Sequence, residues 1–201
     1  MIKRIFISFL VFFVGSLFIQ TKGISYSSNP ESFISEVIEE AKVILSSSSS
    51  SDEKANKLSE IALKTVDVKG LAYYTLGKKR KEITPDELKK YENLFEKYFL
   101  KSFTSRLTDY SDPKINVLSS DVVNEKYTIV KTMLLKTDKR PEVKIDWRVY
   151  TKDPNNPLIR DLIIEGLSLA RTQKEEFASV LNANNNDINV LFSTLERFIE
   201  K

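Results

Sequence analysis

The chain contains no histidine and no cysteine. Histidine is the commonest general base, cysteine supplies the thiol nucleophile, and the two are the usual ligands of zinc. Most hydrolase mechanisms, thiol catalysis and zinc centres are therefore excluded, as are disulfide bonds and a lipid-modified N-terminal cysteine. We expect no enzymatic activity, no catalytic or metal site and no cofactor.

Glycine is also scarce, because the 201 residues include only 5 glycines and these never cluster. Phosphate-binding loops of the P-loop and dinucleotide-binding types need closely spaced glycines, so both are excluded. An acid–base mechanism that uses a pair of carboxylates is not excluded by the composition. Most acids, however, lie among lysines at helical spacing, as between Asp86 and Lys101, which is typical of a solvated helix face. Glu165 differs because it precedes Gly166 in an apolar segment, where it either pairs with a basic side chain or accepts backbone hydrogen bonds near a bulge.

The longest apolar run lies at the N-terminus. Lys3 and Arg4 precede an apolar run over residues 5–19, and a polar stretch over residues 20–28 follows it. This is the three-part layout of a secretory signal. The run is shorter than the roughly 20 apolar residues that a membrane-spanning helix needs. The alternative interpretation is a retained N-terminal anchor.

Small residues place the cleavage site after Ser25. We expect residues 1–25 to be a signal peptide and residues 26–201 to form one domain in the periplasm. The signal peptide holds three of the 31 basic residues and no acid, which leaves 28 basic and 28 acidic residues in the domain. Binding to a nucleic-acid backbone requires uncompensated basic residues, so no nucleic-acid partner is expected.

Two helices are predicted at the start of this domain. An Asn-Pro pair at 29–30 followed by apolar residues at helical spacing predicts a helix over Pro30–Leu45. The serine run at 46–51 has the composition of a flexible joint, yet Ser50 and Glu53 also form a capping box for a second helix. We interpret the run as the loop between the two helices.

The most fully specified helix start is at Thr84. Thr84 fits the N-cap, Pro85 the first helical position, and Glu87 closes the capping box. The helix should run to about Thr108. It presents an aromatic and aliphatic stripe on one face, which is more often core than a ligand wall: Leu88, Tyr91, Phe95, Phe99, Phe103 and Leu107.

Beyond Pro113 the apolar pattern changes from helical to alternating, which predicts four strands joined by short turns. The strands cover about Lys114–Val122, Glu125–Lys136, Glu142–Tyr150 and Leu158–Leu167. Two closing helices follow, one opened by a capping box of Thr172 and Glu175 and one after Asp187. The fold class is therefore α+β, with the N-terminal helices and the long helix packed on a four-stranded, mainly antiparallel sheet and two helices at the C-terminus.

Three sequence blocks together resemble one known family. Residues Leu71–Gly77 running into Ile83–Glu87 resemble its "Y-x-L-G … A-T-P-E-Q" block, Val143–Arg148 its "V-x-V-x-Y/W-R" strand, and Asp161–Leu169 its "Y-D-V-x-I-E-G-V-S-L" segment, with Phe177 matching a later aromatic. The family is the periplasmic lipid-binding component of the Mla phospholipid-transport system, also called the toluene-tolerance or MlaC family. The chain departs from it where many members have a Trp-Lys pair before the Glu-Gly strand and a glycine-bearing turn near the C-terminus.

The resemblance implies an NTF2-like or related fold and a phospholipid ligand held in an apolar cavity between helices and sheet. It also implies exchange of lipid with an inner-membrane ABC transporter complex, through its MCE-domain ring, and with an outer-membrane lipoprotein-porin complex. The candidate cavity-wall residues are Leu71, Tyr74, Leu76, Phe95, Phe99, Phe103, Ile129, Met133, Ile145, Trp147, Ile163 and Leu167.

Two alternatives remain open at this level. An exported adaptor would bind a protein through the sheet edge or the aromatic helix and would have a filled core. A carrier of hopanoid-type lipids would share the cavity but not the ligand. A continuous apolar space between the aromatic helix and the sheet favours a carrier, and a filled core favours the adaptor.

Overall fold

The computed structural model describes residues 25–108, 111–138 and 140–201. The predicted signal peptide lies, apart from Ser25, outside these residues. None of the helices within them combines the length and the apolar character needed to cross a membrane. The elements follow in the order α1 (Pro30–Leu45), α2 (Ser51–Thr65), α3 (Val68–Leu76), η1 (Gly77–Lys81), α4 (Pro85–Leu107), β1 (Ile115–Asn124), β2 (Tyr127–Leu134), β3 (Val143–Tyr150), β4 (Leu158–Ile164), β5 (Leu167–Ser168), α5 (Leu169–Ala183) and α6 (Ile188–Glu200).

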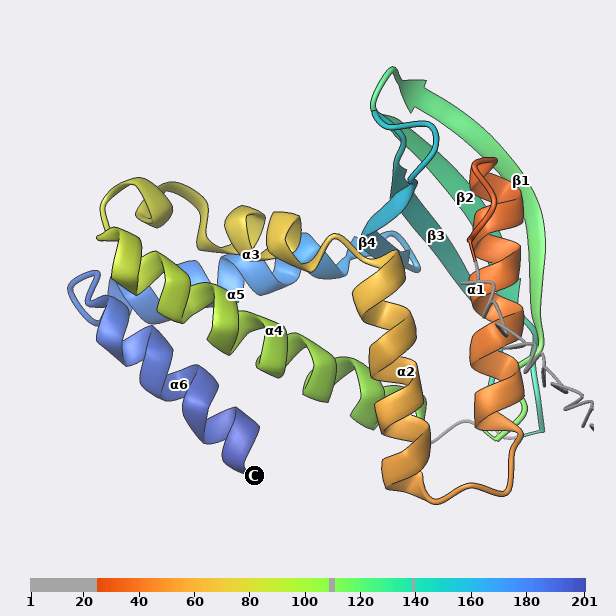
Figure 1. Ribbon diagram of the computed structural model, residues 1–201, viewed down its shortest axis with the longest axis horizontal. Helices are drawn as coiled ribbons and strands as arrows, with labels where there is room; N and C mark the ends of the chain where they lie inside the picture. Colours follow the sequence, from red (N-terminus) through yellow and green to blue (C-terminus); the bar gives the residue numbers. More distant parts are fainter. Residues whose placement is uncertain (1–24, 109–110, 139) are drawn as a thin grey trace, which may run out of the picture.

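The predicted α+β class is confirmed, with one antiparallel sheet in the strand order β1-β2-β3-β4-β5. In Figure 1 the sheet and α1 form one end of the molecule, and α3, α4, α5 and α6 form the other, with α2 between them. The described sheet has a fifth, two-residue strand that the sequence analysis did not separate from the fourth.

The helix starts follow from their caps. Asn29 accepts hydrogen bonds from the backbone of the first turn of α1, and complete capping boxes open α2 at Ser50 and α4 at Thr84. Each cap satisfies backbone N–H groups that have no partner inside the helix. All three predicted starts are therefore confirmed.

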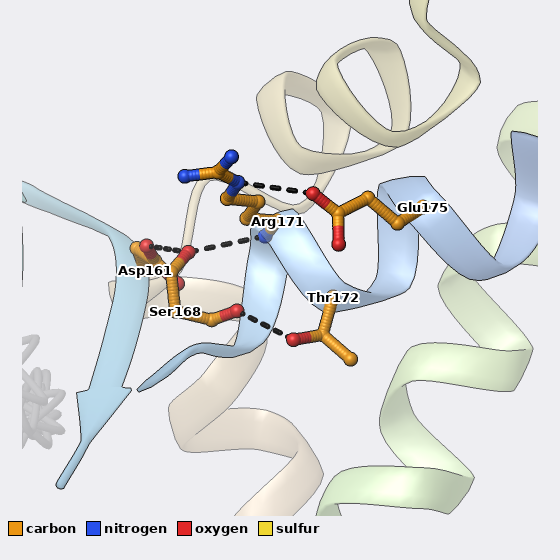
Figure 2. Close-up of polar contacts among 5 residues, drawn as sticks. All are labelled: Asp161, Ser168, Arg171, Thr172 and Glu175. Atoms are coloured by element: carbon orange, nitrogen blue, oxygen red, sulfur yellow. Dashed lines mark hydrogen bonds and ion pairs between the residues drawn. The ribbon is translucent and has the colours of Figure 1, made fainter. Parts of the chain in front are cut away.

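The predicted start of α5 is wrong. Its N-cap is Ser168, whose hydroxyl accepts from the backbone N–H of Arg171 at 3.1 Å. Thr172 lies inside the helix and donates to the Ser168 carbonyl, and Glu175 pairs with Arg171 instead of closing a capping box (Figure 2). The helix begins one turn earlier because a tight turn delivers Ser168 directly to the cap position.

That tight turn is formed by Glu165 and Gly166, which both have positive φ angles, 49° and 83°. Positive φ at both central residues is the geometry of a two-residue type I′ hairpin turn, and glycine adopts it without a steric cost. The Glu165 carboxylate accepts a hydrogen bond from the backbone N–H of Lys144. Of the two interpretations of Glu165, the one in which it accepts backbone hydrogen bonds is confirmed, although the backbone forms a turn and not a bulge.

The buried core is divided into two clusters. The helical cluster joins α3, α4, α5 and α6 around residues such as Tyr91, Phe177 and Leu191. The sheet cluster joins α1, part of α2 and the sheet around residues such as Ile34 and Val130. Val66, which follows α2, packs against both clusters.

Candidate functional site

The strand register separates the side chains of the sheet into two faces. Val130 lies opposite Trp147, and Thr132 lies opposite Ile145. Val130 and Val149 belong to the sheet cluster and pack against α1, so we call this side of the sheet the inner face. Side chains of directly paired residues share a face, so β4 adds Leu162 opposite Trp147 and Ile164 opposite Ile145.

Only part of the inner face is covered. Val130 and Val149 are fully buried. Toward the end of β2 and the start of β3, apolar inner-face residues are only partly buried and belong to neither cluster: Leu134, Val143, Ile145, Leu162 and Ile164. Apolar side chains left partly uncovered on an inward-facing sheet surface indicate a surface that can accept apolar material.

Helix α4 carries a ladder of stacked phenylalanine rings. The ring centroids of Phe95 and Phe99 are 6.4 Å apart and those of Phe99 and Phe103 are 5.7 Å apart, with interplanar angles of 13° and 12°. Phe95 is buried in the helical cluster, whereas Phe99 and Phe103 are partly exposed. The ladder therefore begins in the packed core and continues beyond it along α4.

Helix α4 packs closely against α2, α3 and α6, and within the described residues it has no such contact with any strand. Figure 1 shows α4 running from the far end of the helical half toward α2, with the sheet beyond it. Phe103 in the C-terminal half of α4 and the partly exposed residues of the inner face, such as Ile145, belong to neither buried cluster.

Trp147 has a fixed position on the inner face. Its indole Nε1 donates to the Thr132 hydroxyl at 3.0 Å, and that hydroxyl donates to the Ile145 carbonyl at 2.9 Å. An indole N–H needs a partner when it is buried, and here the neighbouring strand supplies one. The ring packs against the sheet cluster and stays partly exposed.

The twelve predicted wall residues fall into four groups. Phe99, Phe103, Ile145 and Trp147 occupy the partly exposed surfaces just described. Leu71, Leu76 and Phe95 are buried members of the packed helical cluster. Ile129, Met133 and Ile163 lie on the opposite face of the sheet. Tyr74 and Leu167 are 44% and 59% exposed.

The strand register does not bring Ile129, Met133 and Ile163 to the inner face, and their place in a cavity wall stays a prediction. Ile129 pairs with Arg148 and Met133 with Lys144, so all three share the outer face with charged residues. The inner-face residues that the prediction omitted include Val143, Leu134 and Ile164. Val143 could have been predicted from the sequence, because it lies two residues before Ile145 on β3 and therefore shares its face.

A separate hollow of about 350 Å³ lies between α4, α5 and α6. It is lined by Tyr98, Gln173, Glu176, Phe177, Val180, Thr194, Leu195, Arg197, Phe198 and Lys201. None of the predicted wall residues lines it. It is therefore distinct from the inner face of the sheet.

Charged groups near the site hold the scaffold together. Asp67, the N-cap of α3, accepts hydrogen bonds from Arg160 of β4, including one from Nε at 2.6 Å. The Arg160 guanidinium also donates to the Tyr127 hydroxyl and stacks 3.8 Å from the Tyr150 ring centroid. This cluster connects the helical half to the sheet.

The inner face offers few reactive groups. Its residues on β2 and β3 are apolar or threonine, and within the described part of the chain no three potential metal-ligating side chains come together. Burial raises the pKa of the Tyr91 hydroxyl well above its usual value, but this tyrosine lies in the packed helical cluster. The inner face therefore offers mainly apolar contacts.

The fold and the site define an α+β binding scaffold with partly uncovered apolar surfaces on its long helix and its sheet. The family model described as MlaC protein matches residues 32–197. The chain therefore belongs to the MlaC family, and the resemblance drawn from the three sequence blocks is confirmed.

One solved structure shares the fold over most of its length. It is a phospholipid-binding protein from Ralstonia solanacearum, solved in complex with a phospholipid. The match has a TM-score of 0.71 and 16% sequence identity, and it covers 83% of this chain and 94% of the other. No curated protein matches the sequence.

Proposed function

We propose that the protein is a phospholipid carrier of the periplasm that holds lipid tails between the C-terminal half of α4 and the inner face of the sheet. The carrier acts without covalent chemistry. It receives and delivers lipid at an inner-membrane ABC transporter complex with an MCE-domain ring and at an outer-membrane lipoprotein-porin complex. Membership of the MlaC family supports this assignment, as does the shared fold of a protein solved with a phospholipid.

The observation that carries the proposal is the division of the core. Phe103 on α4 and Ile145 on β3 belong to neither buried cluster and stay partly exposed. A domain of this size normally buries such residues in one contiguous core. Apolar side chains left partly exposed on α4 and on the inner face of the sheet are explained if a ligand covers them.

The energetics require an interior site. A phospholipid with two long tails exposes on the order of 30 methylene groups, and at about 0.8 kcal/mol each their transfer from water is worth more than 20 kcal/mol. A few exposed side chains on an outer surface cannot remove enough of the tails from water to gain that free energy. Phenylalanine rings on one side and aliphatic strand residues on the other can surround the tails, while the headgroup stays in water.

The first experiment is native mass spectrometry of the protein purified from a bacterial host, combined with extraction and analysis of its lipid. Because tail burial dominates the binding energy, we expect bound phospholipid with mixed headgroups. A hopanoid-type lipid in place of phospholipid would keep the carrier function and change the ligand. A folded protein without lipid would contradict the proposal.

A second experiment tests transport. Protein loaded with fluorescent phospholipid should deliver it to acceptor vesicles faster than spontaneous exchange does. Delivery at the spontaneous rate would contradict a carrier that releases its ligand.

An adaptor function is the second candidate, and the edge of the sheet favours it. Among the described strands β1 pairs only with β2, so within this part of the chain its other edge offers unpaired backbone groups. Val122 on this strand is 79% exposed. An exposed apolar edge can accept a strand from a partner protein. The mass spectrometry experiment separates the two functions, because an adaptor needs no lipid.

A further inference from the structure

A cluster of basic side chains lies at the end of the helical half farthest from the sheet. It consists of Lys78, Lys79, Arg80 and Lys81 on η1 together with Lys174 on α5, and we call it the basic patch. Figure 1 shows η1 as the turn between α3 and the start of α4, at one end of the long axis of the molecule. Phe103 on α4 and Ile145 on β3, which carry the proposed lipid site, lie on other parts of the fold, whereas Tyr74 of the predicted wall lies next to the patch.

The backbone directs the basic run outward. Gly77 ends α3 with φ 61° and ψ −129°, a conformation that side chains strongly disfavour, and the chain then turns into η1. Lys78, Arg80 and Lys81 are exposed there. Lys174 is brought to the same place from α5, because its Cε would lie 3.4 Å from a Cβ added at Gly77.

Few carboxylates neutralise the patch. Glu82 pairs with Lys79 at 3.5 Å, and the Glu87 carboxylate, which accepts hydrogen bonds at the Thr84 cap, also interacts electrostatically with Lys79. Lys78 and Lys81 have no ion pair in the described part of the chain. Since residues 26–201 carry balanced charge as a whole, the excess of positive charge at this end is local.

Two tyrosines lie beneath the cations. Lys174 Nζ is 4.8 Å from the centroid of the Tyr74 ring, and the Arg80 guanidinium is 5.7 Å from that of Tyr73. Tyr74 is 44% exposed. A tyrosine with an apolar ring and a polar tip suits the boundary between water and lipid, where lysine side chains also extend their charge to the surface.

The residue composition of the basic patch favours a membrane over a protein as its partner. Protein interfaces are enriched in arginine and depleted in lysine, because the guanidinium fork binds carboxylates in a defined geometry. Four of the five cations here are lysines, and the single arginine stacks on Tyr73. Flexible point charges fit a diffuse layer of anionic headgroups, which attracts clusters of basic residues near a bilayer.

We propose that the basic patch is a docking surface for anionic lipid bilayers. It brings this end of the molecule to a membrane whose headgroups carry negative charge. The proposal goes beyond lipid carriage and does not depend on it.

The test is flotation of the protein with vesicles of phosphatidylcholine alone and with vesicles in which a quarter of the lipid is phosphatidylglycerol. We expect binding to the anionic vesicles only, and loss of that binding as salt shortens the screening length from about 10 Å at 0.1 M to about 3 Å at 1 M. Lys78→Gln combined with Lys81→Gln should weaken binding by roughly 30-fold, since each lysine near the surface contributes about 1 kcal/mol.

The matched control is Lys57→Gln combined with Lys64→Gln, which removes the same charge from exposed positions on α2. It should retain most of the affinity for anionic vesicles. The proposal is overturned if the wild type does not distinguish the two vesicles, if the patch variant binds like the wild type, or if both variants weaken equally. Binding to poly-glutamate but not to vesicles would assign the patch to an acidic polypeptide and would also overturn it.

The outcome is separable from the proposed carrier function. Both double variants should keep their thermal unfolding temperature and any lipid that co-purifies with the wild type. A wild-type protein that carries no lipid yet binds anionic vesicles would contradict the carrier function and leave the docking surface standing.

Discussion

Trp147 and Thr132 form a side-chain hydrogen bond between neighbouring strands, with the indole nitrogen 3.0 Å from the threonine oxygen. Thr132 is fully buried, and its own hydroxyl hydrogen is donated to the Ile145 carbonyl. The pair therefore gives both the indole N–H and the Thr132 hydroxyl a partner and sets the position of the one tryptophan of the chain.

This relationship predicts the effect of replacing Thr132 by Val. The valine has nearly the same shape but leaves the Trp147 N–H without a partner, which should lower the free energy of unfolding by about 1–3 kcal/mol. Urea unfolding measures the change. Thr128→Val is the control, because Thr128 is buried on the same face of β2 and its hydroxyl has no hydrogen bond within the described residues. Equal losses in the two variants would contradict this role of Thr132.

Asp161 lies on strand β4 and fixes the N-terminus of α5 through hydrogen bonds. Its buried carboxylate accepts a hydrogen bond from the Ser168 hydroxyl at 2.6 Å (Figure 2). It also accepts one from the Ala170 backbone N–H at 3.0 Å. Asp161→Ala should lower the free energy of unfolding by about 1.5–3 kcal/mol, because it leaves donors at the helix start unsatisfied. Asp153→Ala, at an exposed turn, should change it by less than about 0.5 kcal/mol. Similar losses in both variants, measured by chemical unfolding, would show that Asp161 has no special role.

Much of the fold was predictable because its signals are local. Asn29, Ser50 and Thr84 each open a helix through contacts within three residues, so the sequence contains all the interacting groups. The start of α5 could not be found in this way, since Ser168 reaches its position only through the turn at Gly166 and the bond to Asp161. Thr172 offered a plausible local alternative that the tertiary structure overrides.

The candidate site was predictable only in part, for a related reason. Alternation along β3 shows that Ile145 and Trp147 share a face, but β2 is apolar at adjacent positions such as Ile129 and Val130. Which of the two faces inward depends on the register between strands, and register is not a property of one strand. The sequence also does not show that Phe95 is buried among helices while Phe99, one turn later, is partly exposed.

Arg160 and Asp67 connect the helical half to the sheet through a guanidinium that contacts three side chains. Lysine keeps the charge but cannot donate from both Nε and a terminal nitrogen or stack as a plane on Tyr150. Arg160→Lys should therefore lower the free energy of unfolding by about 1–2 kcal/mol. Arg171→Lys tests the same exchange in an exposed pair with Glu175 and should cost less than about 0.5 kcal/mol. If thermal melts show no difference between the two variants, the connection between Arg160 and Asp67 contributes nothing to the stability of the fold.

Tyr91 should make the protein less stable in alkali. Burial raises the pKa of its hydroxyl above the usual value, whereas in the unfolded chain a tyrosine loses its proton near pH 10. The stabilising contribution is complete below about pH 10 and is lost as the pH rises from there toward the folded-state pKa, by up to about 1.4 kcal/mol per pH unit.

Unfolding of wild type and Tyr91→Phe from neutral pH to about pH 11 measures this contribution. The variant should lose stability less steeply above about pH 10 than the wild type does. Parallel profiles for wild type and Tyr91→Phe would contradict the assignment to Tyr91.

The central claim is that lipid tails lie against the inner face of the sheet. Ile145 and Ile129 are a matched pair for testing it, because they lie on neighbouring strands, are both partly buried, and point to opposite faces. A glutamate at position 145 would place a carboxylate against the tails, where the loss of its hydration is unfavourable. At position 129 it would join the charged residues of the outer face.

The decisive measurement is the amount of phospholipid that co-purifies with Ile145→Glu and with Ile129→Glu, each confirmed as folded by circular dichroism. We expect Ile145→Glu to be folded and depleted of phospholipid, and Ile129→Glu to carry as much as the wild type. Equal phospholipid in the two variants, or loss of folding in Ile145→Glu alone, would contradict a lipid site on the inner face.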